Sequence, residues 1–166
     1  MIKHLLIKKA ASKRGFSLSE LLIVLLIMTI TSMAIAIGIS SAARAYRNVR
    51  AAAESSILCG TLAAELSDTL RYATDISSGS GSAVFTHRRF GQGVSVETVS
   101  TGTNPVKKRV YVGGQEVVSD SAYTELHAGA SVTYNGSYFT LVIKVYDFDG
   151  KTELRSLNLT VAPLSA

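Results

Sequence analysis

One carboxylate in this sequence stands where a charge is costly. Glu20 is followed by a run of residues without an ionisable side chain, which continues to Arg44. A charged side chain in a membrane-spanning helix costs roughly 2.5 to 3.5 kcal/mol even on the mildest scale, so its presence there indicates a function. The chemistry expected of Glu20 is therefore the binding of a positively charged partner that compensates it.

A basic leader and a glycine precede this carboxylate. Lys13 and Arg14 stand directly before Gly15, and Glu20 lies five places beyond that glycine. The segment from Gly15 to Leu21 resembles the cleavage and methylation signature of type IV pilins and type II secretion pseudopilins. The combination of basic leader, glycine, phenylalanine and correctly spaced glutamate is specific, whereas the rest of the chain carries no such match.

The resemblance implies a role for three residues. A membrane peptidase is expected to cut after Gly15, and the same enzyme is expected to methylate the new amino terminus, which is that of Phe16. Glu20 is expected to pair with the amino terminus of a neighbouring subunit during filament assembly.

Other interpretations of this segment stay open. Ser17 and Glu20 also fit a capping box, in which they satisfy free N–H groups at a helix start. That reading is compatible with the first, because a carboxylate in the first turn is favoured by the helix dipole in either case. A secretory signal cleaved near Ser32–Ala36 would need a shorter apolar core, of about 7 to 15 residues. A plain single-pass anchor with an outer domain is the remaining alternative.

A long helix must position these residues. The apolar run Leu21–Ile39 is long enough to cross a hydrocarbon core of about 30 Å, and alanine-rich sequence without proline continues the helix to about Ala73. We expect four segments: a cytoplasmic basic leader at residues 1–15, a membrane and filament-core helix at 16–43, its amphipathic continuation at 44–76, and an antiparallel β-sheet head at 77–166.

The amphipathic continuation carries two apolar stripes on nearly opposite faces. The first comprises Ile39, Ala42, Tyr46, Val49, Ala53 and Ile57, and the second comprises Leu58, Leu62, Leu66, Leu70 and Ala73. Either the helix breaks at Gly60, or the first stripe meets other subunits while the second packs on the chain's own sheet. We favour the second arrangement, because a lone glycine is a weak breaker.

The head is expected to be built from strands. After Ser77–Ser82, which we interpret as a flexible surface loop between shaft and head, the apolar period falls to two. Turns are predicted at Gly113-Gly114, Asn135-Gly136 and Asp149-Gly150. The last three strands form an antiparallel meander with one apolar face, which comprises Phe139, Leu141, Ile143, Val145, Leu157, Leu159 and Val161. The second helix stripe would cover that face, and the fold class is therefore α+β.

The net charge is a signal of topology. The chain of 166 residues has a formal charge of +5, but five of its 17 basic residues lie in residues 1–15, which leaves 12 basic against 12 acidic residues. By the positive-inside rule, the leader holds the amino terminus in the cytoplasm and directs the head outward. The single cysteine, Cys59, excludes an internal disulfide, and we expect it to be a small buried hydrophobe.

Catalytic and metal-binding chemistry has no clear signature. The histidines His4, His87 and His127 are scattered, and no phosphate loop or nucleophile elbow is present, so we expect neither an enzyme nor a cofactor or metal. The segment Asp147–Glu153 has oxygen ligands near a glycine but lacks the spacing of a calcium loop, and a hairpin turn explains it.

Basic residues in the head form two short clusters. They could contact nucleic-acid phosphates if they share one face, or they are solvated edges that discourage strand pairing. These residues are Arg88, Arg89, Lys107, Lys108 and Arg109.

Taken together, the sequence predicts a structural subunit of a type IV pilus or pilus-like filament, of minor pilin or pseudopilin type. The resemblance implies several partners: other pilin subunits, the prepilin peptidase and methyltransferase, the assembly platform with its ATPase, and membrane lipid before assembly. The expected location is the cytoplasmic membrane, with a single span and an outer head, and then a periplasmic or extracellular filament. The alternative is a membrane-anchored or secreted extracytoplasmic binding protein.

Overall fold

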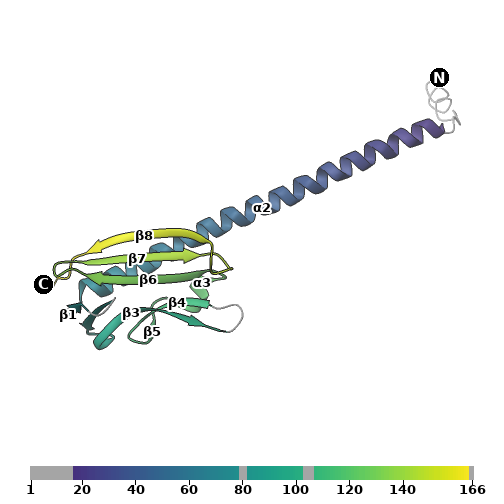
Figure 1. Cartoon of the computed structure of the whole chain (residues 1–166). Helices are drawn as coiled ribbons and strands as arrows, with labels where there is room; N and C mark the ends of the chain where they lie inside the picture. The colour runs from purple at the N-terminus through teal and green to yellow at the C-terminus, as the bar shows by residue number, and fades with distance from the viewer. Residues whose placement is uncertain (1–16, 79–81, 103–106, 165–166) are drawn as a thin grey trace, which may run out of the picture. The chain divides into compact units, whose positions relative to one another are not determined.

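The computed structural model describes residues 17–78, 82–102 and 107–164, and the chain divides into two compact units, residues 1–46 and 47–166. The expected leader and the residues Gly15 and Phe16 lie outside the described residues. Helix α2 runs without interruption over Leu18–Arg71 (Figure 1). A long N-terminal helix is followed by antiparallel sheets, so the α+β class is confirmed.

The first unit contains the apolar part of α2. Every described side chain from Ser17 to Tyr46 is exposed. The hydroxyl groups within this apolar stretch do not compete with the helix, because Thr29 Oγ1 donates to the carbonyl of Leu26 and Thr31 Oγ1 to that of Ile27, at 2.8 and 2.7 Å. A helix that is apolar on all sides belongs in lipid or inside a bundle of helices.

In the second unit, one face of α2 is buried. Its residues recur at steps of three and four, and they are Ser55, Leu58, Cys59, Leu62, Ala63, Leu66, Thr69 and Leu70. The helix continues through Gly60, and its second apolar stripe packs on the chain's own sheets as expected. On the buried face Leu66 is 0% exposed, whereas Ile57 on the other face is 70% exposed.

The helix ends sooner than the sequence predicted. Residues 74–76, placed in the helix above, are strand, because β1 covers Thr74–Ser78 and pairs with β2. The N–H of Leu164 donates to the carbonyl of Arg71 at 2.8 Å, so a distant segment takes up an acceptor at the helix end. Ser77 and Ser78 also belong to β1, which corrects the prediction that Ser77–Ser82 is a loop throughout.

The first five strands form one antiparallel sheet in the order β1-β2-β3-β4-β5. After β1 they are β2 (Ala83–His87), β3 (Gly91–Thr101), β4 (Lys107–Val112) and β5 (Gln115–Glu116). The predicted Gly113-Gly114 turn joins β4 to β5, and both glycines adopt positive φ angles of 56° and 78°. These angles are those of a hairpin turn that favours glycine.

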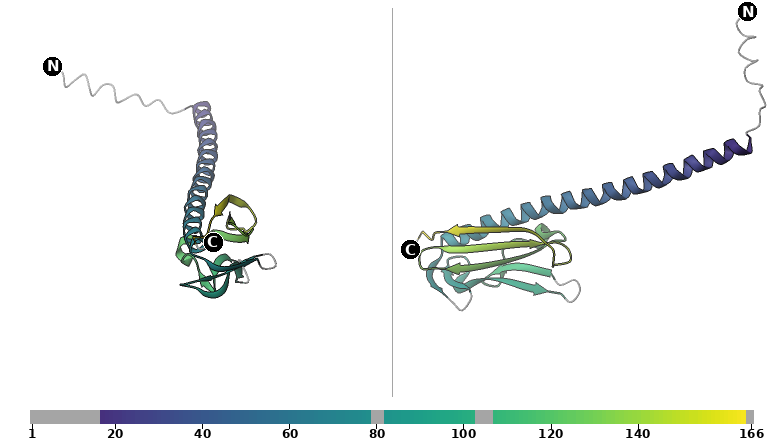
Figure 2. Two further views of the ribbon diagram at one scale, coloured as in Figure 1. Left: turned by 90° about the vertical axis from the view of Figure 1, so that its left-hand side faces the viewer. Right: turned by 45° about the horizontal axis from the view of Figure 1, so that its top comes forward.

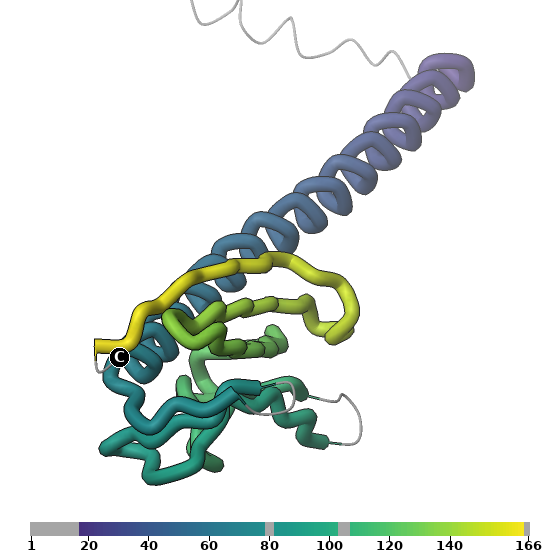
Figure 3. The backbone as a smooth tube through the Cα atoms, turned by 60° about the vertical axis from the view of Figure 1, so that its left-hand side comes forward, coloured from purple at the N-terminus to yellow at the C-terminus, as the bar shows by residue number. Residues whose placement is uncertain are grey.

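The remaining elements are helix α3 and a second sheet. Helix α3 covers Asp120–Tyr123, and the sheet β6-β7-β8 consists of His127–Tyr134, Phe139–Tyr146 and Glu153–Val161. It is the predicted meander, and its strands run alongside the C-terminal part of α2 (Figures 2 and 3). The turn after β6 is fixed by Asn135, whose Oδ1 accepts the N–H groups of Ser137 and Tyr138, both at 3.0 Å.

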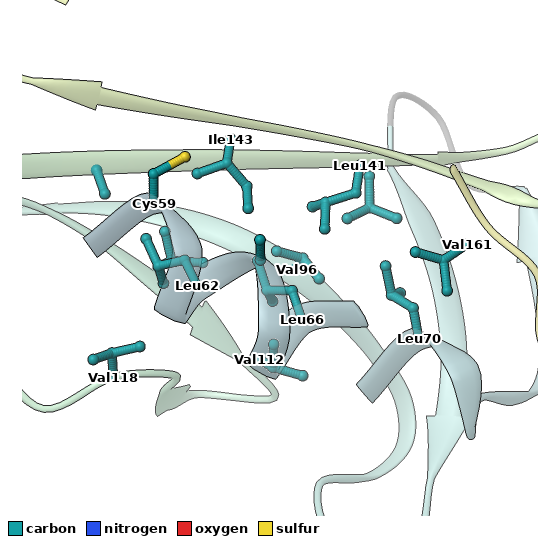
Figure 4. Close-up of a cluster of buried hydrophobic side chains, with 14 of the residues drawn as sticks. Cys59, Leu62, Leu66, Leu70, Val96, Val112, Val118, Leu141, Ile143 and Val161 are labelled. Atoms are coloured by element: carbon teal, nitrogen blue, oxygen red, sulfur yellow. The ribbon is translucent and has the colours of Figure 1, made fainter. Parts of the chain in front are cut away.

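A single apolar core joins α2, α3 and both sheets. Leu62 and Leu66 of the helix belong to one cluster with Val96 and Val112 of the first sheet and Leu141 of the second (Figure 4). The predicted inner face of β7 is buried completely. Cys59 is also buried, as expected, and burial raises the pKa of its thiol.

The buried helix face should dominate the stability of the head. Replacing Leu66 by Ala leaves a cavity between the helix and the sheets, and we expect a loss of about 3 kcal/mol in the free energy of unfolding. The matched control is Ile57→Ala on the exposed face, which should leave that free energy almost unchanged. Denaturant unfolding of the full chain in a neutral detergent measures both. Equal losses in the two variants would contradict this account of the core.

The turn before β8 should make stability depend on pH at the acid end. Asp149 accepts hydrogen bonds from the N–H groups of Thr152 and Lys151 and from the Thr152 hydroxyl, and these bonds lower the pKa of Asp149 to about 2, from an ordinary 3.8. Because the folded state has the lower pKa, the carboxylate stabilises it above the ordinary pKa, and this contribution is lost as the pH falls through the folded value.

We therefore expect Asp149→Ala to lower Tm at pH 7, and the difference from the unmodified chain to shrink as the pH falls from 4 to 2. Asp149→Asn keeps one oxygen acceptor, so we expect a smaller loss, which should shrink over the same pH range because this variant also lacks the charge. Thermal melts over this pH range provide the measurement, and a difference that stays constant down to pH 2 would count against the role of the charge.

Candidate assembly site at the helix start

The start of α2 is closed by a reciprocal pair of hydrogen bonds. The N–H of Glu20 donates to Ser17 Oγ at 3.2 Å, and Glu20 Oε2 accepts the N–H of Ser17 at 3.0 Å. The hydroxyls of Ser17 and Ser19 lie 2.7 Å apart. The capping-box reading of the sequence is therefore confirmed.

This cap holds the Glu20 carboxylate in place but uses only part of its capacity to accept hydrogen bonds. An ionised carboxylate has two oxygens and about four acceptor sites, and the bond from Ser17 occupies one of them. The site is also the positive end of the helix dipole, which favours a negative charge. The carboxylate can thus cap its own helix and accept an ammonium group from elsewhere.

The surroundings of Glu20 are apolar on every side of the helix. Leu18, Leu21 and Leu22 are all exposed in the chain, as are the large apolar residues that follow them. In the part of the chain that the structure describes, α2 is the one helix long and apolar enough to cross a membrane. Once lipid or other helices cover this surface, the Glu20 carboxylate loses its water and needs a charged partner.

A second exposed apolar surface lies in the other unit. Val49 and Ile57 are each 70% exposed, on the face of α2 that the sheets leave uncovered. Beside it, Arg50 Nε pairs with Glu54 Oε1 at 2.7 Å. The Arg50 side chain is largely exposed, so this pair belongs to a solvated face.

The basic clusters do not form one nucleic-acid surface. Arg88 and Arg89 lie in the turn before β3, whereas Lys107 pairs with Thr101 near the other end of that strand. The two ends of β3 are roughly 25 Å apart or more at the usual rise per residue. The structure therefore does not bring the clusters together.

Arg109 must be removed from the candidate contacts altogether. Its side chain is 3% exposed, and its Nη2 and Nε bind Asp120 Oδ1 at 2.7 and 3.0 Å. Its Nη1 donates to the carbonyl of Leu126 at 3.1 Å, and its guanidinium lies 4.1 Å from the centre of the Tyr123 ring. Arg109 fastens α3 to β4, and it lowers the pKa of Asp120 through the hydrogen bond and its charge.

The segment Asp147–Glu153 forms a turn between β7 and β8. The oxygens of Asp149 are engaged by the residues that follow it, and Glu153 Oε2 accepts a hydrogen bond from Lys144 Nζ at 3.1 Å. Within residues 17–78, 82–102 and 107–164, no three His, Cys, Asp or Glu side chains gather into a potential metal site.

Sequence reasoning missed the partners that join distant segments. His127 is buried, where its Nδ1 accepts the N–H of Lys108 at 3.2 Å and its Nε2 lies 3.0 Å from the carbonyl of Phe148. Thr98 Oγ1 bonds both the N–H and the carbonyl of Ala130. The sequence predicted only that these residues lie in strands. Their hydrogen bonds could not be predicted, because these bonds depend on how the two sheets pack together.

Comparison with known proteins bears on the first part of the chain. Residues 11–41 match the family model of the prokaryotic N-terminal methylation motif. No curated protein and no solved structure matches the chain. The matched range includes Gly15, Phe16 and Glu20 and ends inside the exposed apolar part of α2. The chain thus carries the N-terminal signature of type IV pilins and pseudopilins.

Proposed function

We propose that this chain is a structural subunit of a type IV pilus or pilus-like filament, and that its role is that of a minor pilin or pseudopilin. The observation that carries the proposal is the combination of the methylation motif at residues 11–41 with a helix whose large apolar side chains are exposed from Leu18 to Ile39. Such a surface is unstable in water, so it needs lipid before assembly and other helices afterwards.

The precursor would sit in the cytoplasmic membrane with its head outside. The basic residues before Gly15 hold the amino terminus in the cytoplasm by the positive-inside rule. Cleavage after Gly15 by a prepilin peptidase removes this positive tag and creates an amine on Phe16, which the same enzyme methylates. The mature chain can then leave the membrane for the filament with the help of an assembly platform and its ATPase.

Glu20 would set the position of each new subunit. Inside a bundle of apolar helices its carboxylate has lost water, a penalty of several kcal/mol unless an opposite charge replaces the hydration. The amine of a neighbouring Phe16 meets that need only at one axial offset between the two chains. The cap from Ser17 holds the carboxylate in place for this pairing.

The exposed Val49 and Ile57 would form a second contact between subunits. They lie on α2 opposite the face that the sheets bury, so they are available while the head keeps its core intact. The absence of an internal disulfide, with Cys59 as the single cysteine, also favours a minor pilin or pseudopilin over disulfide-stapled pilins.

The charge of Glu20 can be separated from its capping role. Glu20→Gln keeps an oxygen that can cap Ser17 but has no charge, so we expect normal cleavage and at least a tenfold loss of incorporation into sheared filaments, by about 1.4 kcal/mol or more per contact. Glu20→Ala loses both roles and should assemble no better. Immunoblots of filament and membrane fractions measure the yield. If Glu20→Gln assembles like the unmodified chain, the charge plays no part.

Processing at Gly15 is tested by the mass of the mature protein. We expect a chain that begins at Phe16 with one added methyl group, and we expect Gly15→Val to remain as full-length precursor in the membrane, because a branched side chain does not fit a pocket selective for glycine. An amino terminus near Ala36 would instead indicate ordinary secretion, and an intact Met1 in the unmodified chain would indicate a plain anchor. Either result would refute the filament role.

A further inference from the structure

A hollow of about 270 Å³ lies on the head, between the β3–β4 hairpin and the outer face of β6–β7. One wall comes from the first sheet, with Thr98, Ser100 and Lys108. The other wall comes from the second sheet, where Gly129 and Ser131 of β6 stand beside β7. We call this hollow the seam groove, because it follows the line at which the two sheets meet.

Strand register explains why these residues face one another. Thr98 and Ser100 continue the face of β3 that carries the buried Val94 and Val96, and Ser100 pairs with Lys108 across the hairpin. Beyond Val96, this face of β3 therefore leaves the core and carries polar side chains. On the opposite wall, Gly129 pairs with Lys144 and Ser131 pairs with Val142, on the side of β7 that points away from the core.

The two walls are held together by a side chain. Thr98 Oγ1 donates to the carbonyl of Ala130 at 3.1 Å and accepts its N–H at 2.9 Å. It therefore takes the place of a neighbouring strand at the edge of β6. The groove is built on a fixed junction and not on a loose loop.

The floor of the groove is open because residue 129 is glycine. Gly129 is not among the glycines with positive φ, so its backbone would accept any residue. A Cβ atom there would lie 3.4 Å from Thr98 Oγ1 and 3.5 Å from Thr98 Cγ2. A glycine inside a strand that no turn requires is typical of a place where a ligand or another chain approaches closely.

The groove is positively charged. Lys108 Nζ is oriented by the carbonyl of Gly150 at 3.2 Å and by the ring of Tyr146, whose centre lies 4.7 Å away. Lys144 Nζ donates to Glu153 Oε2 at 3.1 Å, which is one contact for a group with three donors. The lining contains no aspartate or glutamate.

Hydroxyl groups complete the lining. Ser100, Ser131 and Tyr146 each contribute one besides Thr98, whose hydroxyl proton is already donated to the Ala130 carbonyl. The two ammonium groups are therefore accompanied by donors and acceptors that suit the hydroxyls of a sugar. The volume lies near the lower limit of small-molecule pockets, which fits one sugar unit better than a nucleic-acid duplex. We propose that the seam groove binds an acidic sugar, with its carboxylate toward Lys144 and Lys108 and its hydroxyls on the hydroxyl-bearing wall.

This binding site goes beyond the filament role, and its test needs no filament. The probe is sodium glucuronate, added to the full chain in a neutral detergent and followed by NMR titration. Glucose is the neutral comparison, inorganic phosphate the simple anion, and a short DNA duplex the polyanion. We expect measurable binding of glucuronate, with glucose and phosphate each at least about tenfold weaker. Glucose lacks the carboxylate that accepts a hydrogen bond from a charged lysine, and phosphate lacks the sugar hydroxyls that bond the facing wall.

Four variants locate the site. Lys144→Gln should weaken glucuronate binding about tenfold, whereas Glu153→Gln should strengthen it by removing the competing carboxylate. Gly129→Val should abolish it by filling the floor, and a thermal melt checks that this strand-compatible residue leaves the head folded. Lys107→Gln is the matched control, because Lys107 is an exposed neighbour outside the groove.

The proposal fails if glucuronate binds no better than glucose, or if Lys107→Gln lowers its affinity as much as Lys144→Gln does. Equal affinity for phosphate would reduce the site to a general anion site and would also overturn it. Tight binding of the DNA duplex, lost in Gly129→Val, would assign the groove to nucleic acid instead.

Discussion

The constraint on which the structure depends is that the apolar surface of α2 must be covered. Between Leu58 and Leu70 the chain covers its own helix, because both sheets and α3 pack on one face and form a single core. Between Leu18 and Tyr46 the described chain provides no cover, and every side chain is exposed. One continuous helix therefore serves two purposes. Its second part organises the head, and its first part exposes an apolar surface that lipid or other helices can cover.

The same constraint gives Glu20 its significance. A carboxylate on a helix surface exposed to water contributes little to stability. Within an apolar environment, the loss of its hydration costs more free energy than most single contacts contribute. The capping bonds with Ser17 explain how the carboxylate is tolerated at the helix start, since they use the free N–H groups of the first turn. They do not neutralise its charge. Capping alone does not require a charged residue at this position, because glutamine also completes a capping box.

Much of this architecture could be predicted from periodicity. The steps of Leu62, Leu66 and Leu70 identified the buried helix face, and the alternation of Phe139, Leu141 and Ile143 identified the inner face of β7. These patterns are local, so one stretch of sequence contains them. β1 was missed because its sequence has little strand character, with Asp75 of a type depleted in strands and Ser77 and Ser78 at its end, and it is a strand through pairing with β2. Arg109 was misplaced for a related reason, because the partners that bury it, Asp120 and Leu126, come from segments that the strand pattern does not reveal.

The groove between the two sheets is lined by residues that are distant in the sequence, so no sequence motif predicts it. Thr98 belongs by period to the inner face of β3, yet it is exposed, because the hairpin passes the edge of β6 and leaves the core there. The residues beyond that point are polar, and the facing position on β6 is a glycine, so the surface stays hollow. This groove shares no residue with the buried helix face or with the exposed Val49 and Ile57. Substitutions at surfaces without shared contacts have nearly additive effects, so the groove can change without loss of the core or of the exposed helix face.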